Sequence, residues 1–294
     1  MGSPACEPRS ERLPLAPLTA KNISLSTGMT LCDAHNHLHD LRLSPKRDEI
    51  LSELTHINVV RFVVNGTRED DWAGVADLAA SDARVVPSFG LHPWNVAQRT
   101  PDWLDRLRDC LAESPRAGIG EIGLDRWVKG HDLALQTEVF LAQLALATAG
   151  NRAATIHCIQ AWGALWEAIS RRPVPQCGFL LHSYGGPLEM VEGFLKRGAR
   201  FSYSAYFLHP RKGAQRDVFR QIPLDRLLIE TDAPDLRPPD EQNRYPLRDE
   251  DGAPINHPAN ITLAYDALGE LRGIPVADLA EQVEKNFTQL FGND

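Results

Sequence analysis

Three histidines stand on alternate positions in the short stretch "LCDAHNHLHD", residues 31–40, within and just after an apolar run. Alternate side chains of an extended segment point to the same face, so His35 and His37 can both point toward one bound cation. Neutral imidazole is a common metal ligand. The pair alone is weak evidence, because exposed or hydrogen-bonded histidines are frequent. His39 extends the alternation, but a third ligand from one short segment is geometrically strained, so we expect a supporting role or none.

Other residues of metal-ligand type follow short apolar runs further along the chain. Each has an ordinary structural alternative: Glu121 as a strand-end carboxylate, His157 as a hydrogen-bonded core histidine, and Asp232 as an Asx-turn residue. His92, in "GLHPW", is expected to contact substrate, although that segment could equally be a rigid turn. The joint pattern favours a metal site formed by His35, His37, Glu121, His157, His182 and Asp232.

Short β-branched runs alternate with segments of helical length from Met29 onward, which is typical of repeated βα units around a parallel sheet. Eight such units predict an α/β fold, a single-domain (β/α)8 TIM barrel, whose strand ends converge on one mouth. Leucines at helical spacing predict a helix over 132–150, with Gly150 suited to the C′ position. The strands are expected near 30–35, 59–66, 84–90, 117–123, 153–157, 177–184, 200–205 and 226–232.

Two segments lie outside this alternation. Residues 1–28 are rich in Pro, Ser and charge, and we interpret them as a flexible N-terminal lead or a cloning remnant before a barrel that spans 29–294. Residues 233–258 carry many Pro, Asp and Gly residues and are expected to form an ordered or mobile loop over the site.

Composition restricts the classes of function. The 294 residues carry a formal charge of −8, which argues against a protein that coats nucleic acid, although a local cationic site remains possible. Five scattered cysteines without CxxC spacing fit a reducing cytoplasm. We expect no membrane span, no obligate protein partner, and no thiol catalysis at Cys158, whose side chain should face away from that of His157.

The segments "DAHNHL", "GLHPW", "GEIGLD", "QTEVFLAQLALA", "TIHC", "LLHSYGG", "ETDAPDL" and "NHPANI" together resemble the TatD family of metal-dependent deoxyribonucleases, within the amidohydrolase-type barrels. The resemblance implies a cytoplasmic nuclease with two divalent metal ions (Zn, Mn or Mg), Glu121 bridging them. It places His35, His37 and Asp232 on one ion and His157 with His182 on the other. Metal-activated water would be the nucleophile, with Asp232 and Glu121 as catalytic residues.

The resemblance also implies nucleic acid as the substrate, and we expect a DNase of 3'-5' exonuclease type that acts on single-stranded ends. Ile159 stands where the family often carries an arginine, and His39 where it often carries an aspartate, which favours a different substrate. Trp94 and Tyr184 are expected to contact substrate, as Tyr206 and Phe207 could, unless these rings only pack at the rim. Candidates for phosphate attraction are Arg126, Lys129, Arg237, Arg244 and Arg248.

Two alternatives remain open. One is a small-molecule hydrolase of the same barrel type that cleaves an amide, lactone or phosphoester. The other is a non-catalytic scaffold, which the intact ligand set disfavours. The aromatic residues after the strand ends disfavour the first alternative, whereas the missing arginine favours it.

Overall fold

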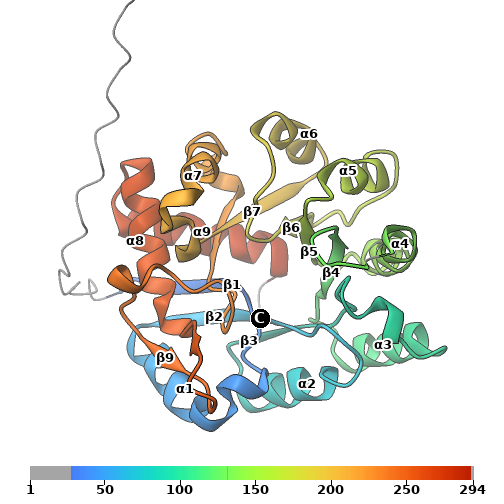
Figure 1. The fold of residues 1–294 in the computed structure, drawn as a ribbon, viewed down its shortest axis with the longest axis horizontal. Helices are drawn as coiled ribbons and strands as arrows, with labels where there is room; N and C mark the ends of the chain where they lie inside the picture. Colours follow the sequence, from blue (N-terminus) through green and yellow to red (C-terminus); the bar gives the residue numbers. More distant parts are fainter. Residues whose placement is uncertain (1–27, 131, 293–294) are drawn as a thin grey trace, which may run out of the picture.

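A computed structural model describes residues 28–130 and 132–292, so nearly all of the N-terminal lead lies outside the described residues. The expected strands are confirmed, and each is followed by helical structure (Figure 1). Their side chains are buried almost throughout, as the apolar runs predicted. The strands are β1 Leu31–Asn36, β2 Val59–Asn65, β3 Val85–Ser88, β4 Ile119–Asp125, β5 Ala154–Ile159, β6 Phe179–Leu181, β7 Ala199–Ser204 and β8 Leu227–Glu230.

Backbone hydrogen bonds close these strands into a ring. Parallel ladders join neighbouring strands in sequence order, β1 through β3 in one sheet and β4 through β8 in another. Between β3 and β4, Ser88 pairs with Gly118 in an isolated bridge. Between the segment after β8 and the end of β1, Asp232 N donates to His35 O at 2.9 Å and His37 N donates to Ala233 O at 2.7 Å. The fold is therefore the (β/α)8 barrel that the sequence predicted, in one domain.

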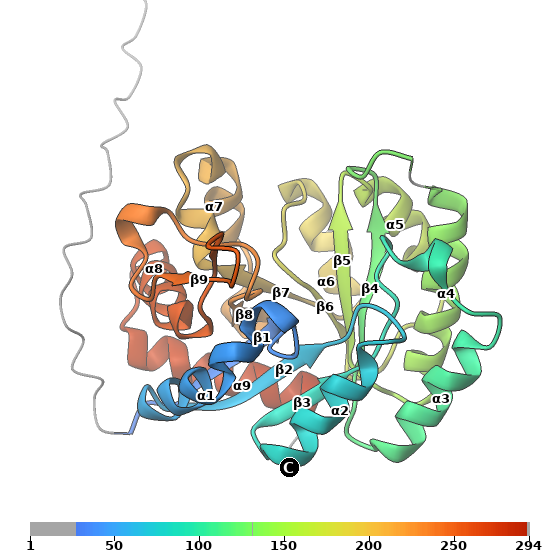
Figure 2. The same cartoon turned by 60° about the horizontal axis from the view of Figure 1, so that its bottom comes forward.

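Helices surround the strands, as Figure 1 shows. Helix α9 differs from the others, because Asn286 Nδ2 donates to Leu227 O at the start of β8, and Thr30 Oγ1 donates to Glu284 at 2.6 Å. It thus covers the N-terminal end of the barrel and leaves the opposite mouth to the loops (Figure 2). The helices are α1 Arg47–His56, α2 Trp72–Ser81, α3 Trp103–Glu113, α4 Leu133–Ala149, α5 Trp162–Ser170, α6 Val191–Lys196, α7 Gly213–Phe219, α8 Ile261–Arg272 and α9 Val276–Phe291.

Helix α4 confirms the helix predicted over 132–150, but its C-terminus differs from the expectation. Asp132 caps the first turn by accepting from Leu135 N at 3.0 Å. Gly150 has φ −89°, a right-handed conformation, whereas Asn151 has φ 44°. The left-handed position therefore falls on an asparagine, which tolerates it better than most residues. Gly150 is the C-cap residue after Ala149 and not the C′ glycine.

The loop over 233–258 is ordered by its own hydrogen bonds. It contains a short hairpin of β9, Leu247–Arg248, and β10, Pro254–Ile255. Asn260 Nδ2 donates to Asn243 Oδ1 at 2.9 Å, which ties the loop to the start of α8. Arg42 Nη1 donates to Asp235 Oδ1 at 2.9 Å and joins the loop to the segment after β1. The structure therefore shows the ordered form of the two that the sequence allowed.

Strand β4 passes so close to β5 that only glycine fits at one of its positions. Gly123 has φ 149°, and a Cβ atom there would lie 2.0 Å from His157 O. This close approach sets the relative height of Glu121 on β4 and His157 on β5.

We expect Gly123→Ala to lower the free energy of unfolding by at least about 2 kcal/mol, because both the backbone angle and the clash with a carbonyl oppose a side chain. Chemical denaturation followed by circular dichroism measures the change. Gly163→Ala is the matched control. Gly163 lies in α5, and an added Cβ there would have nothing within 4 Å, so the stability of this variant should equal or exceed that of the wild type. Equal stability of the Gly123→Ala protein and the wild type would contradict this account of the strand spacing.

Candidate metal centre

Glu121, at the middle of β4, is the residue around which the polar side chains of the mouth gather. Its Oε1 atom lies 2.9 Å from His157 Nδ1 and 2.9 Å from His182 Nε2. Its Oε2 atom lies 3.3 Å from His37 Nε2 and 3.4 Å from His35 Nε2. One carboxylate therefore faces two separate pairs of imidazoles, one pair on each oxygen.

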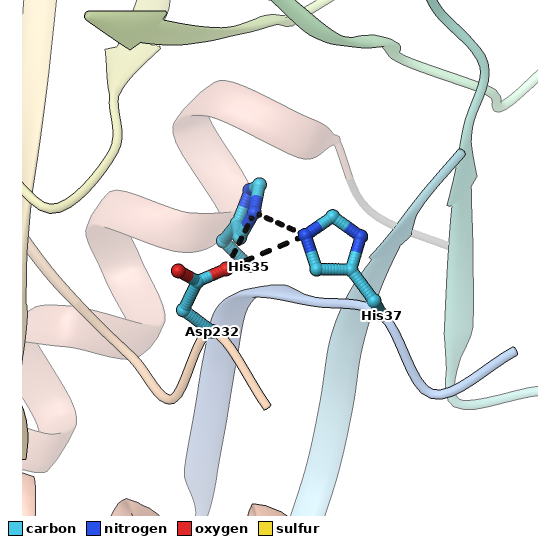
Figure 3. A group of neighbouring side chains, drawn as sticks. All are labelled: His35, His37 and Asp232. Carbon is cyan, nitrogen blue, oxygen red and sulfur yellow. Dashed lines mark hydrogen bonds and ion pairs between the residues drawn. The ribbon is translucent and has the colours of Figure 1, made fainter. Parts of the chain in front are cut away.

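Asp232 completes the group on the side of the first histidine pair. Its Oδ1 atom lies 3.1 Å from His35 Nε2 and 3.4 Å from His37 Nε2 (Figure 3). The six predicted ligand residues are thus brought together in space, and all six are buried. Their donor atoms form compact groups that could hold a metal ion: His35, His37 and Asp232; His35, Glu121 and His182; and His92, Glu121 and His157.

The backbone at Asp232 is held in a sparsely populated conformation. Its φ is 55°, left-handed for a residue with a side chain. Behind it, Asp33 accepts from Thr231 Oγ1 at 2.6 Å and from His35 N at 3.2 Å. Asp33 thereby joins the residues that precede Asp232 to those of β1. Burial raises the pKa of Asp33 to about 7, although these hydrogen bonds oppose the rise.

Burial and charge act in opposite directions on the central groups. Burial alone would raise the pKa of Glu121, but the neighbouring imidazoles, His182 first, hold that pKa well below its ordinary value. Burial alone would lower the pKa values of His37 and His182, but the carboxylates beside them raise both pKa values well above the ordinary one. The pKa of Asp232 is lowered in the same way by His35 and His37. The carboxylates and imidazoles of the centre thus favour each other's charged forms.

Outer acceptors fix which nitrogen of each imidazole faces inward. Asn65 O accepts from His37 Nδ1 at 2.7 Å, and Asp125 Oδ2 accepts from His157 Nε2 at 2.9 Å. A neutral imidazole that donates from one nitrogen keeps a lone pair on the other. His37 Nε2 and His157 Nδ1 are those other atoms, and both face Glu121. Such outer carboxylates and carbonyls orient histidine ligands of metal sites.

The surroundings of His182 and His35 also bear on whether a metal ion fits the site. His182 Nδ1 is buried without a hydrogen bond and lies 3.6 Å from Glu230 Oε1, so it can donate outward while Nε2 faces inward. Asn65 Oδ1 is also buried without a partner, while Asn65 Nδ2 lies 3.0 Å from His35 Nδ1. Exchange of the two ends of this amide would let Asn65 Oδ1 accept from His35 Nδ1, which leaves the lone pair of His35 on Nε2. The donor set, imidazole and carboxylate without thiolate, fits a divalent cation such as Zn, Mn or Mg.

His92 lies in the same cluster but presents a different atom. Its Nδ1 accepts from Trp94 N at 3.2 Å, so its proton is on Nε2, which lies 3.4 Å from Glu121 Oε1. Burial is the largest of the effects that lower the pKa of His92 to about 4. A neutral imidazole with an inward N–H is a hydrogen-bond donor at the mouth, which agrees with the predicted contact to substrate more than with a metal ligand. His39 Nε2 lies 3.4 Å from Asp71 Oδ2, and His39 belongs to none of the three groups that could hold a metal ion.

The two aromatic residues predicted to contact substrate lie in different surroundings. Trp94 is 49 % exposed, and its Nε1 donates to Asp125 Oδ2 at 2.8 Å. Tyr184 is buried completely; its hydroxyl donates to Pro187 O at 2.8 Å, and its ring packs against Trp162. Tyr184 therefore offers no surface to a substrate, and the structure corrects the prediction that it contacts one. The chain turns at Ser183, with φ 41°, and directs Tyr184 into the core.

Several further candidates occupy structural positions. Phe207 is buried beside Tyr203, while Tyr206 accepts from Arg211 Nη2 at 2.7 Å. The thiol of Cys158 is buried, and burial raises its pKa, which supports the expectation that it takes no part in catalysis. The arginines of the long loop have partners: Arg237 pairs with Asp240, Arg244 with Asp266, and Arg248 with Gly252 O.

The outer residues Asp33, Asp125 and Glu230 were not predicted from the sequence. A signal for them exists, because each stands an even number of positions from a predicted ligand on an extended segment. Asp33 precedes His35 by two positions, Glu230 precedes Asp232 by two, and Asp125 follows Glu121 by four. Residues at such spacings share one face of a strand.

The barrel and the imidazoles and carboxylates at its mouth are those of a metal-dependent hydrolase with an amidohydrolase-like fold. The family profile described as TatD related DNase matches residues 32–292, so the chain belongs to that family and is a hydrolase. The uncharacterized metal-dependent hydrolase YjjV of Escherichia coli is 28% identical over 261 residues, which cover 88% of this chain and 96% of that one. The 3'-5' ssDNA/RNA exonuclease TatD of Erwinia tasmaniensis is 29% identical over 262 residues, covering 87% and 97%.

A solved structure agrees with these sequence matches. The crystal structure of YjjV, a TatD homologue from Escherichia coli, superposes with a TM-score of 0.81 at 26% identity, covering 90% of this chain and 98% of that one. Within the described ranges, no helix combines the length and the apolar character that crossing a membrane requires.

Asp125→Asn should weaken metal binding by about 10- to 100-fold, because the amide no longer supplies the charge that orients His157. Competition with a chelating dye measures the affinity. Asp105→Asn is the matched control: Asp105 is an exposed aspartate of α3 that pairs with Arg108. An affinity equal to that of the wild type would show that His157 does not depend on this carboxylate.

Proposed function

We propose that this chain hydrolyses phosphodiester bonds of nucleic acid with two divalent ions, as a DNase that degrades single-stranded ends in the 3'-5' direction. The observation that carries the proposal is the position of Glu121. Its two oxygens face two different pairs of imidazoles, with Oε1 2.9 Å from His157 Nδ1 and Oε2 3.3 Å from His37 Nε2. This is the arrangement expected of a carboxylate shared by two cations.

The chain's own residues then divide the work. His35, His37 and Asp232 would hold one ion, and His157 with His182 the other, with Glu121 between them. When bound, two such ions polarise a phosphoryl oxygen and lower the pKa of water toward neutrality. Asp232, ionised because its pKa is lowered, would orient the attacking water and accept its proton. His92 would donate its Nε2 proton in a hydrogen bond to a substrate oxygen.

Two observations support nucleic acid as the substrate. The relatives from Erwinia tasmaniensis and Erwinia amylovora are named 3'-5' ssDNA/RNA exonucleases. At the mouth, Trp94 exposes an aromatic face and Arg126 and Lys129 are exposed cations that can attract phosphate. An overall charge of −8 means that such attraction is local.

One observation favours the second candidate, a small-molecule amide, lactone or phosphoester hydrolase. Ile159, at the end of β5, is 37 % exposed and apolar at the mouth. The long-loop arginines already have partners, so they are less available to a polyanion. The two candidates differ in whether a polymer is cleaved at all.

Incubation with end-labelled single strands of DNA and RNA, linear and circular, tests the proposal. We expect Mn or Mg to support stepwise shortening of the linear strand, a chelator to abolish it, and a titration to give two divalent ions per chain. The circle should resist cleavage, because an exonuclease needs an end. Cleavage of the circle at an equal rate would exclude the exonuclease form, and no cleavage of any strand by the metal-loaded protein would exclude the nuclease.

Asp232→Asn should lower the rate of the chemical step by about 10²- to 10⁴-fold, because the amide keeps the shape of the side chain but loses its charge and basic oxygen. Metal loss can mimic this result, so metal content and turnover are measured on one preparation at saturating divalent ion. Asp235→Asn, three residues further on and partnered with Arg42, is the matched control. Turnover near that of the wild type with metal retained would show that the cations alone activate the water.

A further inference from the structure

The exposed large hydrophobic side chains of the described residues gather at the mouth of the barrel. They are Leu41, Trp94, Trp127, Ile159 and Leu188, and each stands at or after the C-terminal end of a strand. Leu41 and Leu188 begin short 3-10 helices there, and within the described ranges the α-helices contribute none. Exposed apolar surface costs free energy in water, and its concentration beside a site is typical of a binding surface.

Three of these residues stand at the ends of neighbouring strands: Trp94 follows β3, Trp127 follows β4, and Ile159 is the last residue of β5. The rings of Trp94 and Trp127 have centroids 6.4 Å apart, at an interplanar angle of 33°. Ile159 pairs with Asp125 in the ladder of β4 and β5, and its carbonyl accepts from Arg126 N at 3.0 Å. We call Trp94, Trp127 and Ile159 the indole platform. All three side chains are exposed, and Trp127 is the most exposed, at 62 %.

The platform is fastened to the metal centre through one carboxylate. Asp125 Oδ2 accepts from Trp94 Nε1 at 2.8 Å and from His157 Nε2 at 2.9 Å. Asp125 Oδ1 accepts from Trp127 N at 2.6 Å. Because the indole N–H of Trp94 is already used, Trp94 offers a ligand its face rather than a donor. Since its ring is held in place, little rotamer freedom is left to lose on binding.

The geometry points to an unpaired nucleobase as the occupant of the indole platform. This inference rests on the proposed function and adds the feature of the strand that is recognised. Every base has a π-face, and stacking on fixed aromatic rings needs no particular base. In a duplex those faces are covered by neighbouring base pairs, so the platform selects single strands. Arg126, exposed beside Trp127, supplies a cation for the adjoining phosphate.

The test compares two single-stranded DNA oligonucleotides with equal numbers of phosphates. One carries bases throughout, and the other has abasic residues at the last three positions of both ends. For the metal-loaded wild type we expect kcat/KM to be about 5- to 100-fold higher on the strand with bases. Trp127→Ala should abolish most of this preference and leave the rate on the abasic strand within about twofold. Trp127→Phe, which keeps a ring, should retain much of it.

Trp127 is the residue to change, because Trp94 also holds Asp125. Leu41→Ala is the matched control: Leu41 is 79 % exposed and follows β1, whereas the platform residues stand at the ends of β3, β4 and β5. It should keep the wild-type preference. The inference fails alone if the wild type cleaves both strands equally, or if Trp127→Ala and Leu41→Ala have the same effect. If neither strand is cleaved, the proposed function fails and the platform with it.

Discussion

The burial of Glu121 is the constraint on which the rest of the site depends. Its carboxylate is 3 % exposed, and a buried charge is costly unless partners compensate it. Imidazoles on both sides of Glu121 provide that compensation, and the carboxylates beside them raise the pKa values of His37 and His182 well above the ordinary value. A divalent cation would place positive charge at the same point. Protons and metal therefore compete for one set of lone pairs.

The barrel determines where such a centre can exist. Strand interiors are filled largely by apolar side chains, and the polar groups of the centre converge at the mouth from β1, β4 and β5 and from the segments after β3, β6 and β8. Outside the ligands stand further carboxylates, Asp125 behind His157 and Glu230 behind His182. This outer layer makes the surroundings of the imidazoles negative and so favours cations. It also fixes the tautomer of each ring before any cation arrives.

The fold and the ligand residues could be predicted because both follow from strand periodicity. Eight buried runs predicted the barrel. The polar residues on or just after those runs predicted the ligand set, and the structure brings its members together: His35, His37, Glu121, His157, His182 and Asp232. Predictions that depended on the chain beyond a strand end were weaker. Tyr184 is two residues after His182, but the left-handed turn at Ser183 breaks the alternation and buries its ring. A tertiary turn of this kind leaves no periodic signal in the sequence.

Under the proposed function, the link from Trp94 through Asp125 to His157 would explain how an acidic protein acts on a polyanion. A net charge of −8 gives no general attraction to phosphate, so affinity must come from a few contacts near the centre. Stacking on a fixed indole provides such a contact without any charge. Because the carboxylate that holds the indole also orients a metal ligand, the place where a base would rest and the place where a bond would break are set by the same residue. Substrate position and metal geometry are thereby tied to Asp125.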